Sequence, residues 1–177
     1  TIQVVGGGNV ALAAPLTLAG GGVNASRLTL TGAGTSLDLT NAAIDATSSG
    51  VEKLVAAAGA GGVLTLGATG ATVPLGGADL QASQIRLANA TYRSAGLVTL
   101  TGAVSNTSGS AINLSIDDLD VSGGFNMAGR ALTIAPLTTS RDILLGADGG
   151  GTALGLSATD FASLANVSTL NVGGAGQ

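Results

Sequence analysis

The sequence predicts an all-β protein built as a parallel β-helix, in which short strands stack in successive coils. Three observations lead to this fold class. Short apolar-polar-apolar trios recur along the chain, clusters of turn-forming residues separate them, and the trios return at a nearly constant spacing. Alternation with period two is typical of a strand buried on one face, and a fixed period is typical of a repeat architecture.

The trios define the expected strands. In each one a polar residue stands between two residues suited to the inside of a coil. They are LTL at 16–18 and 28–30, LDL at 37–39, LTL at 64–66, IRL at 85–87, VTL at 98–100, INL at 112–114, LDV at 119–121, FNM at 125–127, LTI at 132–134 and LNV at 170–172. We expect inward side chains at Leu28, Leu30, Ile85, Leu87, Leu132 and Ile134, and outward ones at Thr29, Arg86 and Thr133.

The spacing of the trios predicts coils of about 19–21 residues, a length in the range of known repeat architectures. The intervals from Leu16 to Leu37, from Leu64 to Ile85 and from Ile112 to Leu132 all have this length. A longer echo, VNASRLTL at 23–30 and LQASQIRL at 80–87, has an offset equal to three of the shortest coils. Between the trios, Gly-rich and Asn-rich clusters supply the turns.

Two segments interrupt the pattern and predict short helices. In SGVEKLVAAAG at 49–59, Ser49 precedes Glu52 with the spacing of a capping box, and Gly59 follows an Ala-rich stretch. In SATDFASLAN at 157–166, Ser157 and Asp160 repeat the device. We therefore expect one or two helical excursions from the coils.

Composition excludes several classes of function. The chain of 177 residues has 9% charged residues and a net charge of −4, so it offers no basic surface for nucleic acid. It contains no Cys and no His, which excludes thiolate metal sites and a Ser-His-Asp triad. The uncharged stretch 54–78 holds seven glycines and Pro74, which argues against membrane insertion. We predict no cofactor.

The GGG runs at 6–8, 20–22 and 149–151 raise the question of a phosphate-binding loop. No GK[ST] sequence follows any of them, and no strand-loop-helix unit surrounds them. We therefore expect all three to be turns.

The one cluster of carboxylates is Asp117, Asp118 and Asp120 in SIDDLDVSGG. In a strand, Asp118 and Asp120 share the outer face, while Asp117 faces elsewhere or marks a bulge. Oxygen ligands of this kind favour Ca²⁺ or Mg²⁺, which makes the cluster the candidate metal site. The alternative is a solvated, charged strand that keeps a sheet edge soluble.

Two further groups of residues are candidates for binding or cleaving a carbohydrate. Carbohydrate-active enzymes built on β-helices use acids such as Asp117, Asp118 and Asp120 beside a basic residue, for which Arg86, Arg93 and Arg130 are candidates. Tyr92 with Arg86 and Arg93 also suits a small sugar-contacting patch. The alternative for Tyr92 is to cover the edge of a coil.

The run RDILLGADGGGTALGLSATDFASLANVSTLNVGG, residues 141–174, resembles the repeat units of filamentous haemagglutinin-like large exoproteins, the secreted partners of two-partner secretion systems. In that family a strand and turn lead to an LGLS step, a short acidic helix and a TLxIG-like strand, a role that STLNVGG takes here. The resemblance implies a right-handed parallel β-helix, export across the outer membrane, and work in adhesion, biofilm or surface structure. The chain shows no RGD and no secretion-signal domain, so the resemblance supplies no receptor.

A second resemblance is to bacterial surface-layer and repeats-in-toxin proteins, which share the acidic, Cys-free, Ala/Gly/Thr-rich texture. SGVEKLVAAAG looks like surface-layer segments, whereas GADGGGTALG at 146–155 lacks the order of a calcium-binding nonapeptide. A surface-layer subunit and a β-helix carbohydrate-active enzyme using Asp117, Asp118 and Asp120 are therefore the two alternative functions.

The sequence as a whole predicts a secreted structural or adhesive β-solenoid of a bacterial surface or extracellular filament, without a catalytic role. Residues 1–177 form one solenoid segment in this interpretation. TIQVV at the start and LNVGGAGQ at the end both look like interior coil sequence. We therefore expect the segment to continue into neighbouring repeats or to associate end to end with its own copies, with a host or surface glycan as a further candidate partner.

Overall fold

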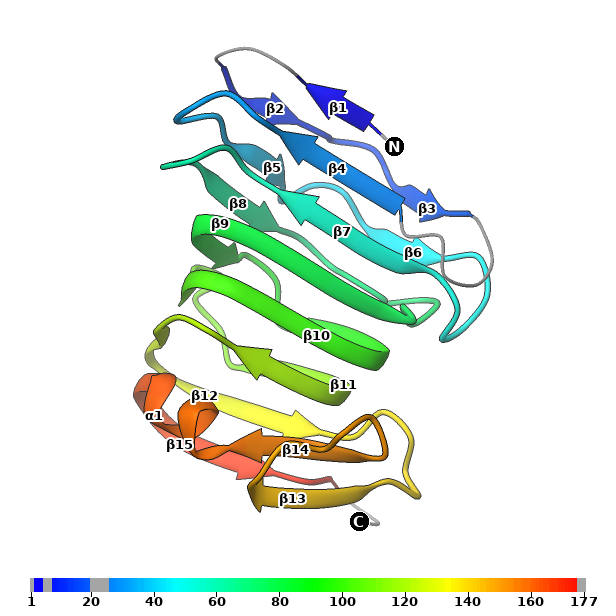
Figure 1. The fold of residues 1–177 in the computed structure, drawn as a ribbon, viewed down its shortest axis with the longest axis vertical. Helices are drawn as coiled ribbons and strands as arrows, with labels where there is room; N and C mark the ends of the chain where they lie inside the picture. The colour runs from blue at the N-terminus through cyan, green and yellow to red at the C-terminus, as the bar shows by residue number, and fades with distance from the viewer. Residues whose placement is uncertain (1, 5–7, 20–25, 175–177) are drawn as a thin grey trace.

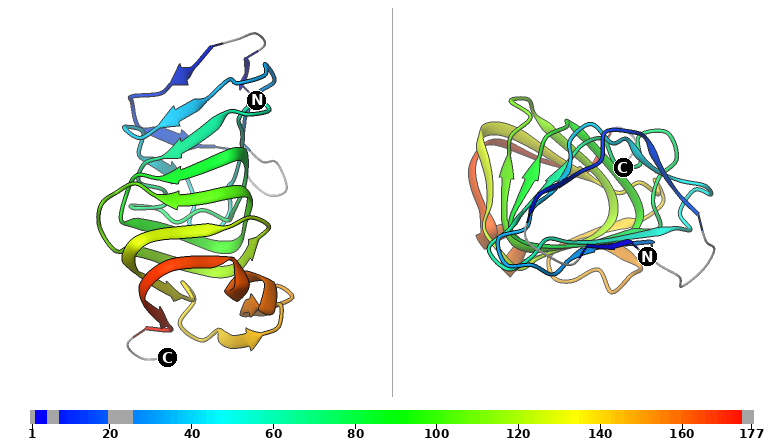
Figure 2. Two further views of the ribbon diagram at one scale, coloured as in Figure 1. Left: turned by 90° about the vertical axis from the view of Figure 1, so that its left-hand side faces the viewer. Right: turned by 90° about the horizontal axis from the view of Figure 1, so that it is seen from above.

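The computed structural model describes residues 2–4, 8–19 and 26–174, and these residues form mainly β-structure with one short helix. Figure 1 shows the strands stacked one above another, with the N-terminus and the C-terminus at opposite ends of the long axis. Seen along that axis, the chain runs around a common interior (Figure 2). No helix in the described part of the chain is long and apolar enough to cross a bilayer.

The bounds of the elements are as follows. The strands are β1 (Ile2–Val4), β2 (Val10–Ala11), β3 (Leu16–Leu18), β4 (Ser26–Leu30), β5 (Leu37–Leu39), β6 (Ile44–Ala46), β7 (Lys53–Ala57), β8 (Val63–Leu66), β9 (Gly77–Leu87), β10 (Thr91–Asn106), β11 (Ile112–Val121), β12 (Phe125–Ala135), β13 (Asp142–Gly146), β14 (Ala153–Ser157) and β15 (Leu164–Val172). Helix α1 (Ala158–Ser163) lies between β14 and β15.

Every strand pairing among the described residues is parallel. Three ladders contain all the pairings except that of β13 with β14, which form a separate two-stranded sheet. The first runs through β1, β4, β7, β9, β10 and β11. The second runs through β2, β5, β8, β9, β10, β12 and β15. The third joins β3 to β6 and continues through single bridges at Thr69 to β10, β11, β12 and β15. The long strands β9, β11, β12 and β15 each contribute to two ladders, and β10 contributes to all three.

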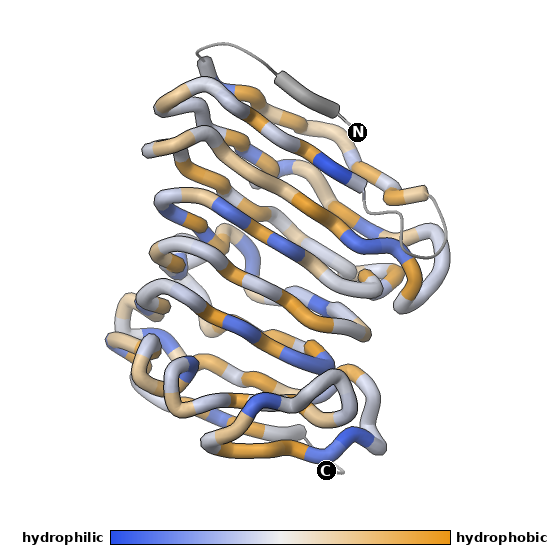
Figure 3. The backbone as a smooth tube through the Cα atoms, in the orientation of Figure 1, coloured by the Kyte–Doolittle hydropathy of each residue, from blue (hydrophilic) through white to orange (hydrophobic). Residues whose placement is uncertain are grey.

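Aliphatic side chains fill the interior in columns that follow these ladders. The six positions predicted to point inward are all at most 5% exposed, which confirms the inward face of their strands. Arg86 is exposed, and Thr29 and Thr133 are partly exposed, as expected for outward positions. Figure 3 shows the resulting alternation of hydrophobic and hydrophilic residues along the strands. The buried column of the second ladder consists of Leu37, Leu64, Ile85, Val104 and Phe125.

The predicted spacing holds in the middle of the chain and is wrong near its N-terminus. Leu64 pairs with Ile85, and Ile112 pairs with Leu132, as the intervals between their trios predicted. Leu16, in contrast, pairs with Ile44 instead of Leu37. Near the N-terminus, one passage of the chain around the interior takes more residues, because it consists of three separate short strands joined by loops. From β9 onwards, single strands bend from one ladder into the next and need fewer residues.

The longer echo between 23–30 and 80–87 is also out of register. Ser26 pairs with Leu54, and Leu54 pairs with Ala78, so Ser26 shares a column with Ala78 instead of Ser83. The first residues of the echo, 23–25, lie outside the described residues. The two similar segments therefore both form strands, but their matching residues do not lie in the same column of the stack.

One predicted helix is wrong and the other is confirmed. Residues 49–59 contain strand β7, which pairs with β4 on one side and β9 on the other. These two ladders of hydrogen bonds override the helix preference of the Ala-rich sequence. Glu52 caps a turn instead, because its Oε2 accepts a hydrogen bond from the Ser48 backbone at 3.0 Å. Helix α1 forms where expected, with the capping box between Ser157 and Asp160.

Candidate functional site

The acidic segment of β11 places its three carboxylates in different surroundings. Asp117 is 1% exposed, Asp118 is partly buried and Asp120 is exposed. The pairing of β10 with β11 shifts register here, so that the two residues between Ser94 and Leu97 lie opposite Asp117. Asp118 and Asp120 lie on the outer face as predicted, whereas the bulge lies in β10, opposite Asp117, and Asp117 itself faces inward.

The carboxylate of Asp117 is buried among partners from the segment that follows β12. Its Oδ1 accepts a hydrogen bond from the Thr138 backbone at 2.8 Å, and its Oδ2 accepts one from Thr138 Oγ1 at 2.6 Å. Arg141 Nε lies 3.4 Å from Oδ2 and forms an ion pair with it. The interpretation of the whole cluster as a solvated strand is therefore wrong for Asp117, since sequence spacing does not reveal which later segment covers it.

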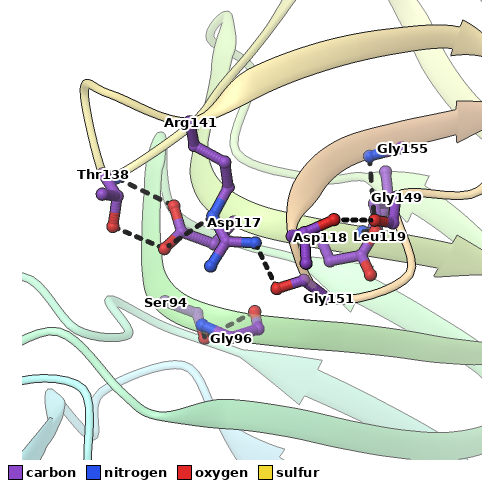
Figure 4. A network of polar contacts seen from close by, with 11 residues as sticks. Ser94, Gly96, Asp117, Asp118, Leu119, Thr138, Arg141, Gly149, Gly151 and Gly155 are labelled. Carbon is purple, nitrogen blue, oxygen red and sulfur yellow. Dashed lines mark hydrogen bonds and ion pairs between the residues drawn. The ribbon is translucent and has the colours of Figure 1, made fainter.

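Arg141 connects Asp117 to the Gly-rich loop between β13 and β14. While its Nε faces Asp117, its Nη1 donates a hydrogen bond to the Gly151 carbonyl at 2.7 Å. Figure 4 shows the guanidinium between these two partners. The loop forms the turn predicted for the GGG run 149–151 and returns the chain so that the consecutive strands β13 and β14 pair in parallel. Run 20–22 and residues 6 and 7 lie outside the described residues.

Asp118 reaches the same segment from the outer face of β11. Its Oδ1 accepts a hydrogen bond from the Leu119 backbone at 3.1 Å and a longer one from the Gly155 backbone at 3.4 Å. With Asp120 and Asp148 it lines an open groove between β11 and the Gly-rich loop. The three carboxylates of Asp118, Asp120 and Asp148 therefore give this groove an acidic lining.

A fourth carboxylate, Asp160, completes the attachment from the side of helix α1. Its Oδ1 accepts a hydrogen bond from the Val121 backbone at 2.9 Å. Its Oδ2 accepts hydrogen bonds from the Ser157 backbone at 2.8 Å and from Ser157 Oγ at 2.7 Å. The sequence predicts the contacts with Ser157, but it carries no signal for the contact with Val121, which is distant along the chain.

These contacts join β11 to residues 136–163, which we name the anchored segment. The segment lies between β12 and β15, where the offset between paired residues, as between Leu132 and Leu170, is nearly twice that between β11 and β12. Charge-assisted hydrogen bonds are stronger than neutral ones, and burial of Asp117 and Asp160 strengthens them further. These contacts are suited to hold the anchored segment against β11, the last strand of the first ladder.

The structure does not bring Asp117, Asp118 and Asp120 together as one set of metal ligands. Asp117 turns inward to Thr138 and Arg141, while Asp120 faces solvent. Within residues 2–4, 8–19 and 26–174 there is no group of three or more carboxylate, His or Cys side chains that could hold a metal ion.

The arginines named as partners of the acids lie elsewhere. Arg86 Nε donates to Gln84 Oε1 at 2.8 Å, and Arg93 Nη1 donates to the Ala71 carbonyl at 3.2 Å. Arg130 lies in β12 opposite Val167 of β15. Arg141, which sequence reasoning missed, takes the role at Asp117. The only sequence feature that could have indicated Arg141 is its position directly before the strand sequence DILLG.

Tyr92 is part of the interior instead of a sugar-contacting patch. The side chain is buried, and its hydroxyl donates a hydrogen bond to the Leu66 carbonyl at 3.2 Å and accepts one from the Asn89 backbone at 3.0 Å. Burial raises the pKa of the Tyr92 hydroxyl well above its ordinary value. A buried ring cannot stack on a carbohydrate, so the predicted patch with Arg86 and Arg93 does not form.

No family model matches this chain, and no curated protein or solved structure matches it.

Proposed function

We propose that the chain is a right-handed parallel β-helix that acts as a structural scaffold of a secreted bacterial surface or extracellular filament. The observation that carries the proposal is the set of three parallel ladders, which extend along the described chain over continuous aliphatic columns. In such an architecture each coil is stabilised by its neighbours, and the product is a stiff rod instead of an enclosed pocket.

The resemblance of residues 141–174 to filamentous haemagglutinin-like exoproteins supports the same function. In the structure this run contains strand β14, helix α1 and strand β15 in the order that the resemblance implies. The capping box at Ser157 and Asp160 starts the helix directly after the LGLS step. The resemblance also supports export from the cell and an adhesive or biofilm role, with a surface glycan as a candidate partner.

The carboxylates of the candidate site also favour a structural role. Asp117 and Asp160 are buried and accept hydrogen bonds from the chain itself. An acid-base pair needs carboxylates that face a bound substrate. We therefore assign no catalytic role to the protein, and release of sugars from a panel of polysaccharides by the purified chain would contradict this assignment.

The proposed function is tested on intact cells of the organism that encodes the chain. An antibody raised against the purified protein should label unlysed cells or the culture medium, and protease added outside the cells should remove the signal. Deletion of the gene should reduce attachment to surfaces or biofilm mass. A signal found only after lysis would overturn the surface location, while calcium-dependent formation of two-dimensional sheets would favour the surface-layer alternative.

A further inference from the structure

We propose that the anchored segment, residues 136–163, opens as a unit while the ladders of the stack stay folded, and that this opening uncovers the edge of β11. An interruption in the hydrogen bonding between β11 and β14 carries the proposal. The interrupted edge lies inside the chain, because β12, the anchored segment and β15 all follow β11 in sequence. The opening goes beyond the proposed scaffold function and does not depend on it.

Strand β14 takes the place of a next strand in the first ladder without pairing with β11. In Figure 1, β14 lies below β11, and the arrows of both strands point to the left of the view. The two strands are in contact, and Leu154 and Leu156 of β14 pack in the same core as Leu119 and Val121 of β11. In the described part of the chain, however, β14 pairs only with β13.

Asp118 is the first of two carboxylates that lie between the facing backbones. Its Oδ1 accepts hydrogen bonds from the Leu119 N–H of β11 at 3.1 Å and from the Gly155 N–H of β14 at 3.4 Å. Figure 4 shows this oxygen between the two strands. One carboxylate oxygen therefore connects two N–H donors from two different strands.

Asp160 repeats this bridge two residues further along both strands. Its Oδ1 accepts a hydrogen bond from the Val121 N–H of β11 at 2.9 Å, and its Oδ2 accepts one from the Ser157 N–H of β14 at 2.8 Å. We name the contact through Asp118 and Asp160 the carboxylate seam. In the seam, carboxylates take the place that backbone carbonyls have in a continuous ladder.

The carboxylate seam is weaker than the ladders beside it. Strands β9 and β10 are bonded directly to neighbours on both sides, whereas β14 is bonded directly only to β13. An isolated two-stranded sheet is at most marginally stable in water. Regions with few direct backbone bonds open at a lower free energy than the whole fold. The anchored segment therefore opens before the ladders unfold.

Both ends of the anchored segment stay attached when it opens. The flanking strands β12 and β15 pair with each other, as at Leu132 with Leu170, and this pairing does not involve the segment. The open segment is thus a flap tethered at two points. It uncovers the N–H groups of Leu119 and Val121, and an unpaired strand edge of this kind is a template for another strand.

Hydrogen exchange followed by NMR spectroscopy in low concentrations of urea tests the opening in the unchanged protein. We expect the amides of Gly155 and Ser157 to exchange at a lower free energy of opening than the amides of β9 and β10, together with the amide of Val121. Equal free energies of opening for these amides and for β9 and β10 would overturn the proposal, because the segment would then open only when the whole chain unfolds.

Two variants that each remove one negative charge test the role of the seam. Asp160 uses separate oxygens for its two backbone donors, and an amide has only one acceptor oxygen, so Asp160→Asn leaves one N–H facing an NH₂ group. We expect exchange in the anchored segment to become roughly tenfold faster or more, with β9 and β10 unchanged. The control is Asp118→Asn, which keeps the single oxygen that accepts both bonds. Its effect should stay below about threefold.

The two variants also separate the seam from a general loss of stability. Absence of any acceleration in Asp160→Asn, equal acceleration by both variants, or acceleration spread over the ladders would overturn the proposal. Labelling of intact cells does not depend on this opening, so its failure is distinguishable from failure of the proposed function.

Discussion

At the scale of single residues, buried polar groups determine how the end of the chain attaches to the stack. Asp117 is covered by Thr138 and Arg141, and Asp160 holds both the start of α1 and the backbone of Val121. Such groups are costly when one partner is removed, because the remaining partner stays buried without compensation. Two predictions concern individual residues of this kind.

The first prediction is that Asp117→Ala lowers the free energy of unfolding by about 2–3 kcal/mol, since it leaves the Thr138 backbone and Arg141 without their acceptor. Urea denaturation followed by circular dichroism measures the change. The matched control is Asp120→Ala on the same strand, where the carboxylate is exposed and the expected change is within about 0.5 kcal/mol. Equal effects of the two variants would contradict the anchoring role of Asp117.

The second prediction concerns alkaline pH. The pKa of Tyr92 is raised in the folded protein, so the unfolded chain loses this proton first as the pH rises. The stabilisation is complete below the ordinary tyrosine pKa of about 10. It is lost as the pH rises above that value. Because Tyr92 is the only tyrosine, tyrosinate absorbance should appear together with unfolding.

The control for this prediction is Tyr92→Phe, whose stability should depend less steeply on pH above about 10. Tyrosinate absorbance at the ordinary pKa in a chain that is still folded would show that the hydroxyl is accessible.

At the scale of elements, close stacking of successive turns makes several glycines necessary. Gly102 has a φ of 126°, and a Cβ at this position would overlap the Ala82 carbonyl on the preceding strand. The register of β9 and β10 shifts at the same place, between Thr101 and Ala103. The corner where β10 passes from the first ladder to the second therefore tolerates no side chain.

The third prediction is that Gly102→Ala destabilises the fold by about 2–3 kcal/mol, through overpacking against the neighbouring backbone and through its positive φ. Thermal unfolding measures the loss. Gly124→Ala is the control, since a Cβ there meets no atom within 4 Å and the φ is not in the left-handed region. If both variants melted like the unchanged chain, the tight approach of β9 and β10 at this corner would be wrong.

At the scale of the whole molecule, the aliphatic columns connect each turn of the chain to the next. Leu87 is 2% exposed and packs in the interior at the end of β9, between β8 and β10. A defect in one column affects the strands on both sides of it, because each strand of a ladder pairs and packs with its two neighbours.

The fourth prediction is that Leu87→Asp prevents folding, since an unpaired charge in the interior is among the most costly substitutions. The adjacent outward change Arg86→Asp should leave the melting temperature within a few degrees of the original, because Arg86 is exposed. Circular dichroism and thermal melts of both variants measure this. An unchanged melting curve for Leu87→Asp would mean that the inward face of β9 is assigned incorrectly.

Local sequence predicted the strands, their inward faces and the helix at Ser157, because alternation and a capping box depend on residues that are close in the chain. It predicted the pairing of Leu64 with Ile85, where one strand follows the other with short turns. It failed for Leu16 and for the segment 49–59, since turn lengths and the hydrogen bonds of two neighbouring strands override local preference. The partners of Asp117 and Asp160 emerged only in three dimensions, because long-range packing alone decides which carboxylate a returning segment buries.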